Sequence, residues 1–237
     1  MSSKNKIALI TGASSGLGKH LSISLSSKGY HCILASRNES KLSELANEIK
    51  SQNYLCTTIP TDISSVKSID KLYLQCSKIG FVELIIHNAG IGKFSKIEET
   101  KVEDFDSQIK VNLRAPFIIS KKFIPDMKNN KKGRLVFINS IAGKYGYPYS
   151  SAYVSSKFGL RGLSETLRME LRKDNIKVIS IHPGSIDTPF WDKIDVDFPK
   201  SEMLDPSSVA NDIINAIESK GNSVVEEIVI RRTKGDF

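Results

Sequence analysis

The feature that most constrains this chain is a regular alternation between short apolar runs and longer amphipathic stretches. Several runs, such as Leu84–Ile86 and Leu135–Ile138, are apolar without interruption, as expected when helices cover both faces of a sheet. The predicted strands are Ile7–Thr11, His31–Ala35, Leu55–Ile59, Leu84–His87, Gly133–Asn139, Val178–His182 and Val224–Ile230. The predicted helices are Gly16–Ser27, Ser40–Lys50, Ser65–Lys78, Val102–Lys128, Ala152–Lys173 and Pro206–Ser219. This order indicates an α/β fold: a doubly wound parallel sheet of about seven strands with helices on both faces.

The chain shows no linker, repeat or low-complexity tract, so we expect a single domain over residues 1–237. Its least regular stretch is 185–205, which contains two prolines and Trp191. This stretch follows the carboxyl end of a predicted strand, where ligands bind in open α/β sheets. Long irregular connections inside a domain are usually functional or mobile. We interpret residues 185–205 as a substrate loop or lid, with a plain surface loop as the alternative.

The chain is basic, with 34 Lys and Arg against 26 Asp and Glu and a net charge of +8. A lysine-rich solvated surface accounts for this charge, and attraction for an anionic partner such as a phosphorylated cofactor is the alternative. No nucleic-acid-binding module accompanies the charge, so we expect no nucleic-acid partner. No apolar run approaches the roughly 18 residues of a membrane span. The first residues do not resemble a secretion signal. We therefore expect a cytoplasmic protein with no membrane partner.

Cysteine and histidine usage excludes two further classes of site. Cys32, Cys56 and Cys76 are an odd count without a C-x-x-C pair, which favours buried, reduced thiols. The four histidines show no metal-ligand spacing, so we predict no metal site.

A glycine-rich segment, Thr11-Gly12-Ala13-Ser14-Ser15-Gly16-Leu17-Gly18, directly follows the first predicted strand and opens the first predicted helix. Gly12 permits a sharp turn, Gly16 lets the backbone approach a pyrophosphate, and Gly18 lets the helix pack closely on the sheet. The helix N-terminus supplies oriented N–H groups. The spacing is G-x-x-x-G-x-G rather than the commoner G-x-G-x-x-G, and a plain strand-to-helix turn is the alternative. The context favours a Rossmann fold whose dinucleotide site includes Gly12, Ser14, Ser15, Gly16, Leu17 and Gly18.

The end of the second predicted strand bears on the choice of dinucleotide. It reads Ala35-Ser36-Arg37-Asn38, without the acidic residue that usually binds the ribose hydroxyls of NAD. Ser36 can donate a hydrogen bond, and Arg37 can bind or stack over a 2′-phosphate. We therefore predict NADP(H) in preference to NAD(H), with a solvated loop arginine as the alternative for Arg37.

Two later strand ends complete the predicted pocket. Asp62, which precedes Ile63, is placed to accept from the adenine amino group, or instead to cap the helix that begins near Ser64 or Ser65. Asn88-Ala89-Gly90 offers a tight turn of small residues beneath the cofactor, although ordinary loops use such residues too.

Tyr153 and Lys157 lie four residues apart in a predicted helix and therefore share a face. Reducing a carbonyl requires a hydride at carbon and a proton at oxygen, and a phenol with its free pKa near 10 is a poor acid–base group at neutral pH. A neighbouring ammonium group lowers that pKa. Ser140, at the end of a predicted strand, can hydrogen-bond the substrate oxygen. A surface Tyr/Lys pair and a loop serine are the alternatives, but the combination indicates carbonyl–alcohol redox chemistry.

Together these motifs resemble the short-chain dehydrogenase/reductase family over nearly the whole chain: Thr11–Gly18, Asn88–Gly90, Asn112, Ser140, Tyr153, Lys157 and Pro183-Gly184. The resemblance implies that Tyr153 is the proton donor or acceptor, that Ser140 orients the carbonyl, and that Lys157 lowers the pKa of Tyr153 and binds the ribose. It also implies that Asn112 holds the water of a proton relay. The residues that would border the nicotinamide are Pro183, Gly184, Ile186 and Thr188.

The sequence departs from the family pattern at two positions. His87 stands where an asparagine is usual, and we interpret it as a tolerated strand-end residue. Ser15 stands where some NADP-binding members carry an extra basic residue, so the cofactor prediction depends mostly on Arg37.

The resemblance implies an NADPH-dependent oxidoreductase that reduces a small ketone or aldehyde to an alcohol, reversibly. One alternative is a 3-oxoacyl-[acyl-carrier-protein] reductase, whose acidic carrier would dock on Lys131, Lys132 and Arg172. The other is a non-catalytic NADP-sensing protein. The helical patterns Val102–Lys128 and Ala152–Lys173 resemble those through which family members associate, so we expect a homodimer or homotetramer.

Overall fold

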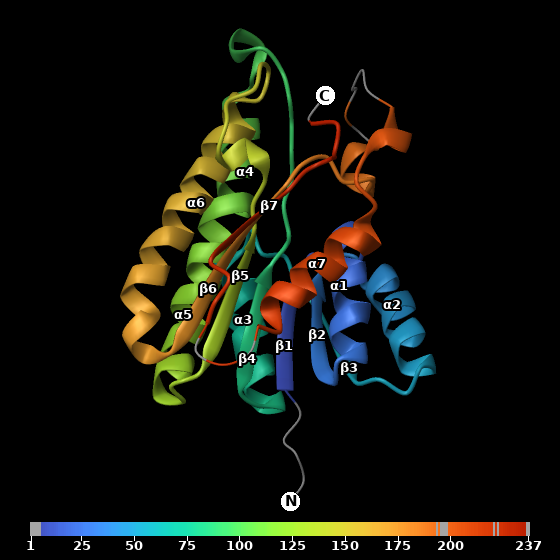
Figure 1. The fold of residues 1–237 in the computed structure, drawn as a ribbon, viewed down its shortest axis with the longest axis vertical. Coiled ribbons are helices and arrows are strands. Elements are labelled where there is room, and N and C mark those ends of the chain that lie inside the picture. The colour runs from blue at the N-terminus through green and yellow to red at the C-terminus, as the bar shows by residue number, and fades with distance from the viewer. Residues whose placement is uncertain (1–5, 193, 195–198, 220, 222, 236–237) are drawn as a thin grey trace, which may run out of the picture.

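Seven parallel strands form one sheet in the computed structural model, which describes residues 6–192, 194, 199–219, 221 and 223–235 (Figure 1). The spatial order is β3-β2-β1-β4-β5-β6-β7, so the chain first moves outward from β1 and then returns past it. This reversal places a topological switch point between β1 and β4, where ligands bind in such sheets. The strands are β1 (Lys6–Thr11), β2 (Tyr30–Ser36), β3 (Cys56–Pro60), β4 (Val82–His87), β5 (Gly133–Ile138), β6 (Ile176–Pro183) and β7 (Glu227–Ile230).

Helices cover both faces of the sheet because successive strand residues point to opposite sides. In β1, Ala8 and Ile10 join the core beneath α1, α2 and α7, whereas Ile7 and Leu9 join the core beneath α3, α5 and α6. Figure 1 shows α1, α2 and α7 together on one side of the molecule. The α-helices are α1 (Gly16–Ser27), α2 (Glu39–Ser51), α3 (Val66–Ile79), α4 (Val102–Ile109), α5 (Ala115–Asn129), α6 (Ser151–Leu171) and α7 (Pro206–Ile217). The predicted α/β, doubly wound fold is confirmed.

The predicted helix Val102–Lys128 is wrong in one respect, because it is three segments rather than one. A π-helical turn, η2 (Lys110–Arg114), separates α4 from α5. Pro116 in the first turn of α5 has no N–H group to donate to the carbonyl four residues earlier, which belongs to Asn112. The α-helical hydrogen-bond pattern is therefore interrupted at Asn112. Such π-turns frequently occur at functional sites.

Most other boundaries agree with the predictions within two residues, and the edge strand β7 differs most. We predicted Val224–Ile230, but only Glu227–Ile230 pairs with β6. An edge strand pairs with a neighbour on one side only, so β7 extends only as far as its backbone stays paired with β6.

The predicted lid, 185–205, is more ordered at its two ends than its composition indicates. Ile186 and Leu204 form a parallel bridge, and the N–H group of Leu204 donates to the Ser185 carbonyl at 2.9 Å. Short 3-10 helices cover Pro189–Trp191 (η5) and Lys200–Glu202 (η6). Residues 193 and 195–198 of the predicted lid lie outside the described residues.

The three cysteines are free and buried, which confirms the prediction of unpaired thiols. Burial raises the pKa of Cys32 and of Cys76 to about 12, so these thiols are unreactive. Within the described part of the chain, no helix is both long enough and apolar enough to cross a membrane.

Candidate active site

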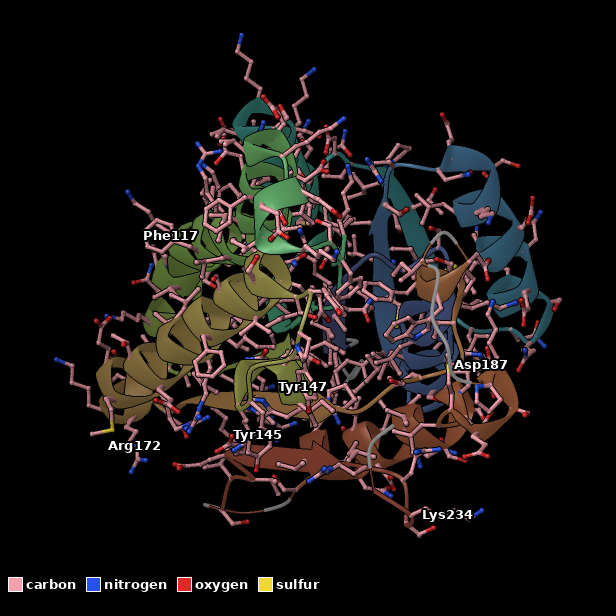
Figure 2. All side chains as sticks on the ribbon, turned by 90° about the horizontal axis from the view of Figure 1, so that it is seen from above. Phe117, Tyr145, Tyr147, Arg172, Asp187 and Lys234 are labelled. Atoms are coloured by element: carbon pink, nitrogen blue, oxygen red, sulfur yellow. The ribbon has the colours of Figure 1, made fainter. Side chains whose placement is uncertain are left out.

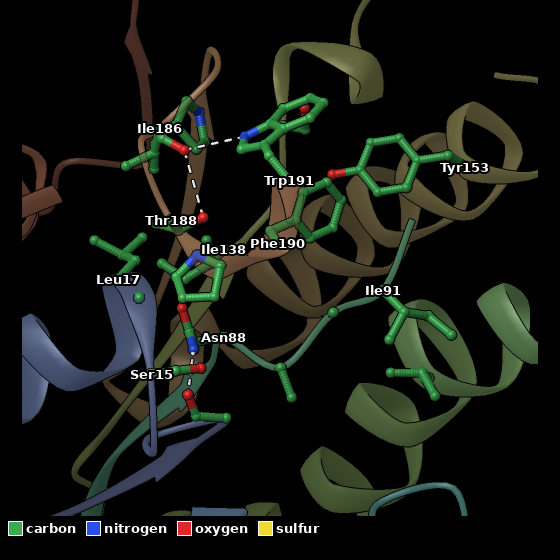
Figure 3. Close-up of a pocket in the computed structure, with 18 of the residues that line it drawn as sticks. Ser15, Leu17, Asn88, Ile91, Ile138, Tyr153, Ile186, Thr188, Phe190 and Trp191 are labelled. Carbon is green, nitrogen blue, oxygen red and sulfur yellow. Dashed lines mark hydrogen bonds between the residues drawn. The ribbon is translucent and has the colours of Figure 1, made fainter. Parts of the chain in front are cut away.

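A cavity of about 1280 Å³ opens at the carboxyl ends of the strands, at the switch point between β1 and β4 (Figure 3). All but two of the residues predicted to form the site line it. The lining includes Gly12, Ser14, Ser15, Gly16, Leu17, Ser36, Arg37, Asp62, Ile63, Asn88, Ala89, Gly90, Ser140, Tyr153, Lys157, Pro183, Gly184, Ile186 and Thr188. The two that do not line it are Gly18 and Asn112.

The glycine turn has the backbone geometry that its sequence predicts. Gly12 and Gly16 have φ angles of +66° and +52°, in the left-handed region that favours glycine. A Cβ atom on Gly18 would lie 2.2 Å from the carbonyl oxygen of Gly12, so only glycine allows α1 to approach the turn this closely. Gly18 therefore shapes the turn without lining the cavity. Ser15, at the N-cap of α1, makes no side-chain bond to the helix, and Ser15, Gly16 and Leu17 all line the cavity.

The Asn88 side chain braces this turn. Its Nδ2 atom donates to the carbonyl oxygens of Thr11 at 3.0 Å and Gly12 at 3.1 Å. The Thr11 hydroxyl accepts from the backbone N–H groups of Asn88 and Ala89 at 3.1 and 3.2 Å. The ends of β1 and β4 are thus tied together, and the floor of the cavity is fixed before any ligand binds.

Two basic side chains line the wall at the end of β2. Arg37 is exposed, and Lys41, from the first turn of α2, joins it. The neighbouring Ser36 hydroxyl lies 2.7 Å from that of Ser14 and so connects the wall to the glycine turn. We did not predict Lys41. The sequence signal that could have identified Lys41 as a cavity residue is its position four residues after Arg37, in the first turn of the next helix.

Asp62 lines the cavity, its predicted contact with the adenine amino group stays a prediction, and the alternative role of capping the next helix is wrong. Its carboxylate accepts from the N–H group and hydroxyl of Ser64 at 3.0 and 2.9 Å, which closes a local turn. Ser65 is the N-cap of α3, and its hydroxyl accepts from the Ser68 N–H group. The exposed carboxylate of Asp62 remains at the cavity wall beside Ile63.

Tyr153, Lys157 and Ser140 converge in the middle of the cavity. The Lys157 ammonium lies 5.6 Å from the centre of the Tyr153 ring, on the same face of α6, and donates to the Ile138 carbonyl at 3.0 Å. The Ser140 hydroxyl oxygen accepts from the Ala142 N–H group at 3.1 Å, which leaves the hydroxyl proton for another acceptor. Figure 3 shows the Tyr153 hydroxyl pointing into the cavity.

The pKa of Tyr153 differs in direction from our prediction. Burial raises it to about 12, and the hydrogen bond with Ser140 opposes that rise only in part. Burial also lowers the pKa of Lys157 to about 8. The cost of burying a phenolate therefore sets the direction in the protein alone, and the expected lowering of the tyrosine pKa by Lys157 is not seen. At neutral pH Tyr153 is a protonated acid.

Asn112 lies behind this group rather than in the cavity wall. Its side chain is buried, accepts from the Ile91 N–H group at 2.9 Å, and donates to the Ile91 carbonyl at 2.8 Å and to Ser156 at 3.0 Å. These bonds hold the backbone next to Gly90. A Cβ atom on Gly90 would lie 3.5 Å from Asn112 Oδ1 and 3.8 Å from Lys157 Nζ, so all three residues adjoin one small space. The proton-relay role of Asn112 remains a prediction.

An aromatic wall that sequence reasoning found only in part faces Tyr153. The Phe94 ring lies 5.4 Å from the Tyr153 ring and 6.2 Å, nearly parallel, from the Trp191 ring. Phe190 contacts both Tyr153 and Trp191 at 5.9 and 5.1 Å. The Trp191 indole N–H group donates to the Ile186 carbonyl at 3.0 Å, which fixes the ring (Figure 3). Phe94 lies in an irregular segment, where no periodic pattern marks a cavity residue.

Tyr149 extends the lining with a strained backbone. Its φ angle is +62°, which is uncommon for a bulky residue, and its carbonyl accepts from the Ser95 N–H group at 2.8 Å. Such conformations persist only where the surroundings enforce them, and they cluster at functional sites. The bond to Ser95 joins the two loops that carry Phe94 and Tyr149.

The comparisons with known proteins agree with this geometry. The sequence profile described as short chain dehydrogenase matches residues 6–197. The chain is 32% identical to a sepiapterin reductase of Chlorobaculum tepidum over 98% of both chains. A solved alcohol dehydrogenase from the archaeon Thermococcus sibiricus, complexed with 5-hydroxy-NADP, has a TM-score of 0.89 at 28% identity over 97% of both chains. A metagenomic short-chain oxidoreductase in complex with NADP has a TM-score of 0.84 at 28% identity, over 96% of this chain and 97% of that one.

The chain therefore belongs to the short-chain dehydrogenase family. It is an oxidoreductase by that membership, as the resemblance of its motifs implies.

Proposed function

We propose that this protein is an NADPH-dependent reductase of small ketones or aldehydes. One observation carries the proposal: a single cavity joins the glycine turn to Ser140, Tyr153 and Lys157. Neither half alone distinguishes a reductase from a nucleotide-binding protein. Their juxtaposition supplies a place for a dinucleotide next to a proton donor.

The residues present fit NADP(H). The turn at Gly12 and Gly16 and the first-turn amides of α1 suit a pyrophosphate. Arg37 and Lys41 supply two cations at the wall where the adenosine 2′-phosphate would lie. The residue at the end of β2 is Ser36 rather than an acidic residue that would repel the phosphate. The two solved neighbours named above are complexes with NADP or a derivative of it, which supports the same choice.

The protein's contribution to reduction follows from three side chains. The bound cofactor would supply the hydride. The Ser140 hydroxyl, whose oxygen already accepts from the Ala142 N–H group, keeps its proton, donates a hydrogen bond to the carbonyl oxygen and so orients it. Tyr153 then donates the phenolic proton to that oxygen as negative charge develops on it. The Lys157 ammonium, 5.6 Å from the ring, stabilises the phenolate that remains.

The raised pKa of Tyr153 sets the protonation state from which reduction starts. A phenol with a pKa of about 12 is fully protonated at neutral pH and serves as an acid without prior proton uptake. Oxidation of an alcohol requires the phenolate instead, which burial disfavours. Reduction therefore starts from the protonated tyrosine, and Lys157 would have to offset the weak acidity of the phenol by stabilising the phenolate as it forms.

The cavity walls favour a neutral, apolar substrate. Of the described lining residues, the charged ones besides Lys157 are Arg37, Lys41 and Asp62, and all three follow β2 or β3, away from the aromatic wall. The substrate side combines Phe94, Phe190 and Trp191 with Tyr153. We infer a carbonyl group attached to an aromatic or bulky apolar group.

The carrier-protein alternative is less favoured by the positions of its three expected docking residues. Lys131 and Lys132 precede β5, whereas Ser140 follows it, so roughly 20 Å of strand separates them. Lys132 pairs with Glu83 at 2.5 Å, and Arg172 pairs with Glu226 at 2.6 Å. A carrier docked on these residues would lie at the opposite end of the sheet from the cavity.

We also propose a homodimer or homotetramer, assembled through the side of the molecule formed by α4, α5 and α6. Large apolar side chains are exposed there: Phe105, Phe117, Phe158 and Met169. Phe117 lies at the outer edge of this side (Figure 2). Apolar patches on a protein surface often mark interfaces. Light scattering at micromolar concentration tests this, and a single monomeric species would refute it. A cytoplasmic location remains part of the proposal, because free thiols persist in reducing compartments.

A carbonyl and alcohol panel with NADPH, NADH and their oxidised forms, followed at the nicotinamide absorbance, tests the activity. We expect NADPH oxidation with at least one apolar or aromatic ketone or aldehyde, and a much lower rate for Tyr153→Phe. Binding of NADPH with no turnover across the panel would instead support a nucleotide-sensing protein.

A further inference from the structure

His182 is a fully buried histidine directly behind Ser140 that the proposed mechanism does not use. It lies near the end of β6, one residue before Pro183, and none of its surface is exposed. Its Nδ1 atom lies 3.0 Å from the backbone carbonyl oxygen of Ser140. A buried polar ring adjacent to a residue of the reaction centre requires a physical account.

A short network holds the other side of the imidazole. The Nε2 atom lies 2.9 Å from a carboxylate oxygen of Glu227 on β7 and 3.1 Å from the Ser180 hydroxyl. The Lys144 ammonium lies 2.5 Å from the same Glu227 oxygen. Lys144 ends the 3-10 turn η3 (Ile141–Gly143) that begins after Ser140. The network therefore starts and ends on the segment 140–144 and passes through two neighbouring strands.

The position of the imidazole proton follows from the partners. A carbonyl oxygen only accepts, so Nδ1 must carry the hydrogen that binds Ser140. Burial lowers the pKa of His182. The Ser140 carbonyl and Glu227 raise it, whereas the positive charges of Lys144 and of Arg161 on α6 lower it. In the neutral ring Nε2 accepts from the Ser180 hydroxyl and has no proton to donate to Glu227. The Lys144 ammonium, which binds the same Glu227 oxygen, offsets the repulsion between that carboxylate and the Nε2 lone pair.

We propose that His182 is a positioning residue for the Ser140 hydroxyl, with the Ser180 hydroxyl anchoring the imidazole at Nε2. The inference rests on the proposed reductase function. Donation from Nδ1 fixes the Ser140 carbonyl, which also accepts from the Gly143 N–H group at 2.9 Å. The peptide that follows Ser140 is thereby held in place. Because the Ser140 hydroxyl accepts from Ala142, two residues further on, a rotated peptide would redirect the hydroxyl proton away from the substrate oxygen.

A matched pair of variants separates positioning from packing. His182→Asn keeps an amide N–H group where Nδ1 lies, whereas His182→Gln carries its amide one bond further, towards Nε2. We expect His182→Gln to lower kcat roughly tenfold, as a small misplacement at a reaction centre does, with KM for the carbonyl and Kd for NADPH unchanged. His182→Asn should recover most of that loss. Equal losses in both variants, or losses that follow the thermal stability, would overturn the inference.

A spectroscopic measurement, begun on the wild-type protein, tests the network without relying on turnover. Nitrogen-15 NMR of the wild-type protein near pH 8 should show the His182 ring protonated at Nδ1 and unprotonated at Nε2. The reverse tautomer would contradict the inference. Glu227→Gln, which changes a half-buried residue, should shift the Nε2 resonance and leave Nδ1 protonated. Neither spectrum involves turnover. A wild-type protein inactive towards every carbonyl would therefore refute the proposed function, whereas the His182 tautomer would still be determined independently.

Discussion

The two halves of the cavity are built by different physical means. Around β1 and β2, backbone conformation sets the geometry: Gly12 and Gly16 adopt left-handed φ angles, and Gly18 allows a contact that any Cβ atom would block. The charged groups on that side, such as Arg37, are exposed. Around β5 and α6 the chemistry depends on burial, which shifts the pKa values of Tyr153 and Lys157 in opposite directions.

This difference has a consequence for stability and function. Glycines in a turn cost conformational entropy but leave no charge unsolvated. A buried ammonium group is disfavoured at neutral pH, and the protein keeps it beside Tyr153 at that cost. The cofactor half is thus prepared by shape and the reacting half by electrostatics. The two halves should respond differently to mutation and to pH.

The largest expected effect concerns the reacting half. Tyr153→Phe removes the proton donor and keeps the ring, so kcat should fall by about 10²-fold or more, the scale of general acid catalysis. Binding of NADPH, measured by fluorescence titration, should not change. Tyr149→Phe is the matched control, because it removes a second phenolic hydroxyl from the same cavity lining. Near-normal turnover in Tyr153→Phe would exclude the assigned role.

Replacing the buried ammonium group should stabilise the fold while abolishing activity. The pKa of Lys157 falls from 10.5 to about 8 on folding. Below pH 8 the folded protein therefore carries a charge whose burial costs about 3 kcal/mol, and above pH 10.5 this cost vanishes because the amine is neutral in both states. The Lys157→Met variant also loses the hydrogen bond to the Ile138 carbonyl, which removes about 1 kcal/mol of the stability that it gains. Lys157→Met should raise the free energy of unfolding at pH 7 by about 2 kcal/mol.

Urea denaturation at several pH values measures this effect. The difference in the free energy of unfolding between Lys157→Met and the wild-type protein should shrink as the pH rises from 8 to 10.5. Only the wild-type protein carries the buried amine, so only its stability increases as that amine deprotonates. Lys71→Met, at an exposed position of α3, is the control and should show no such trend. A destabilised Lys157→Met protein at pH 7 would mean that local bonds outweigh the burial cost.

The same contrast explains what could be predicted from the sequence. The glycine turn, the order of strands and helices along the chain, and the positions of Ser140, Tyr153 and Lys157 follow from local periodicity and spacing, and most of the predicted site residues line one cavity. The direction of the Tyr153 pKa shift depends on how many atoms surround the phenol, which no spacing reveals. Phe94 likewise enters the site only through loop packing, and Lys144 reaches the His182 network behind Ser140 only through its partner Glu227 on β7.

A local signal was available in one place where our prediction failed. Pro116 lacks the N–H group that would bond the carbonyl of Asn112, so the interruption of the helix Val102–Lys128 was present in the sequence. We interpreted the amphipathic period alone and missed it. The π-turn turns the buried Asn112 side chain toward Ile91 and Ser156.

In the cofactor half, a change of exposed charge should alter selectivity rather than rate. Arg37→Asp should reduce the preference for NADPH over NADH by about tenfold or more, since charge-assisted hydrogen bonds to phosphate are strong and a carboxylate repels it. Lys41 should retain part of the preference, so Arg37→Asp combined with Lys41→Ala should lower it further. The measurement is the ratio of kcat/KM values for the two cofactors.

Lys28→Asp provides the control for this change of charge. It alters the net charge equally at an exposed position outside the cavity lining. Equal shifts in Lys28→Asp and Arg37→Asp would indicate that the overall field of the protein, rather than a local contact, selects the phosphate.

The smallest expected effect is a pH dependence that distinguishes the two buried groups. The pH dependence of kcat/KM for NADPH in carbonyl reduction reports the pKa values of titrating groups in the free protein. Lys157, with a pKa of about 8, loses its charge as the pH rises through 8, whereas Tyr153 stays protonated until about 12. The value for carbonyl reduction should therefore fall by about threefold between pH 7.5 and 8.5, with circular dichroism confirming the fold. An inflection near 10 instead would mean that the reacting half titrates like solvent-exposed side chains, and the contrast with the cofactor half would fail.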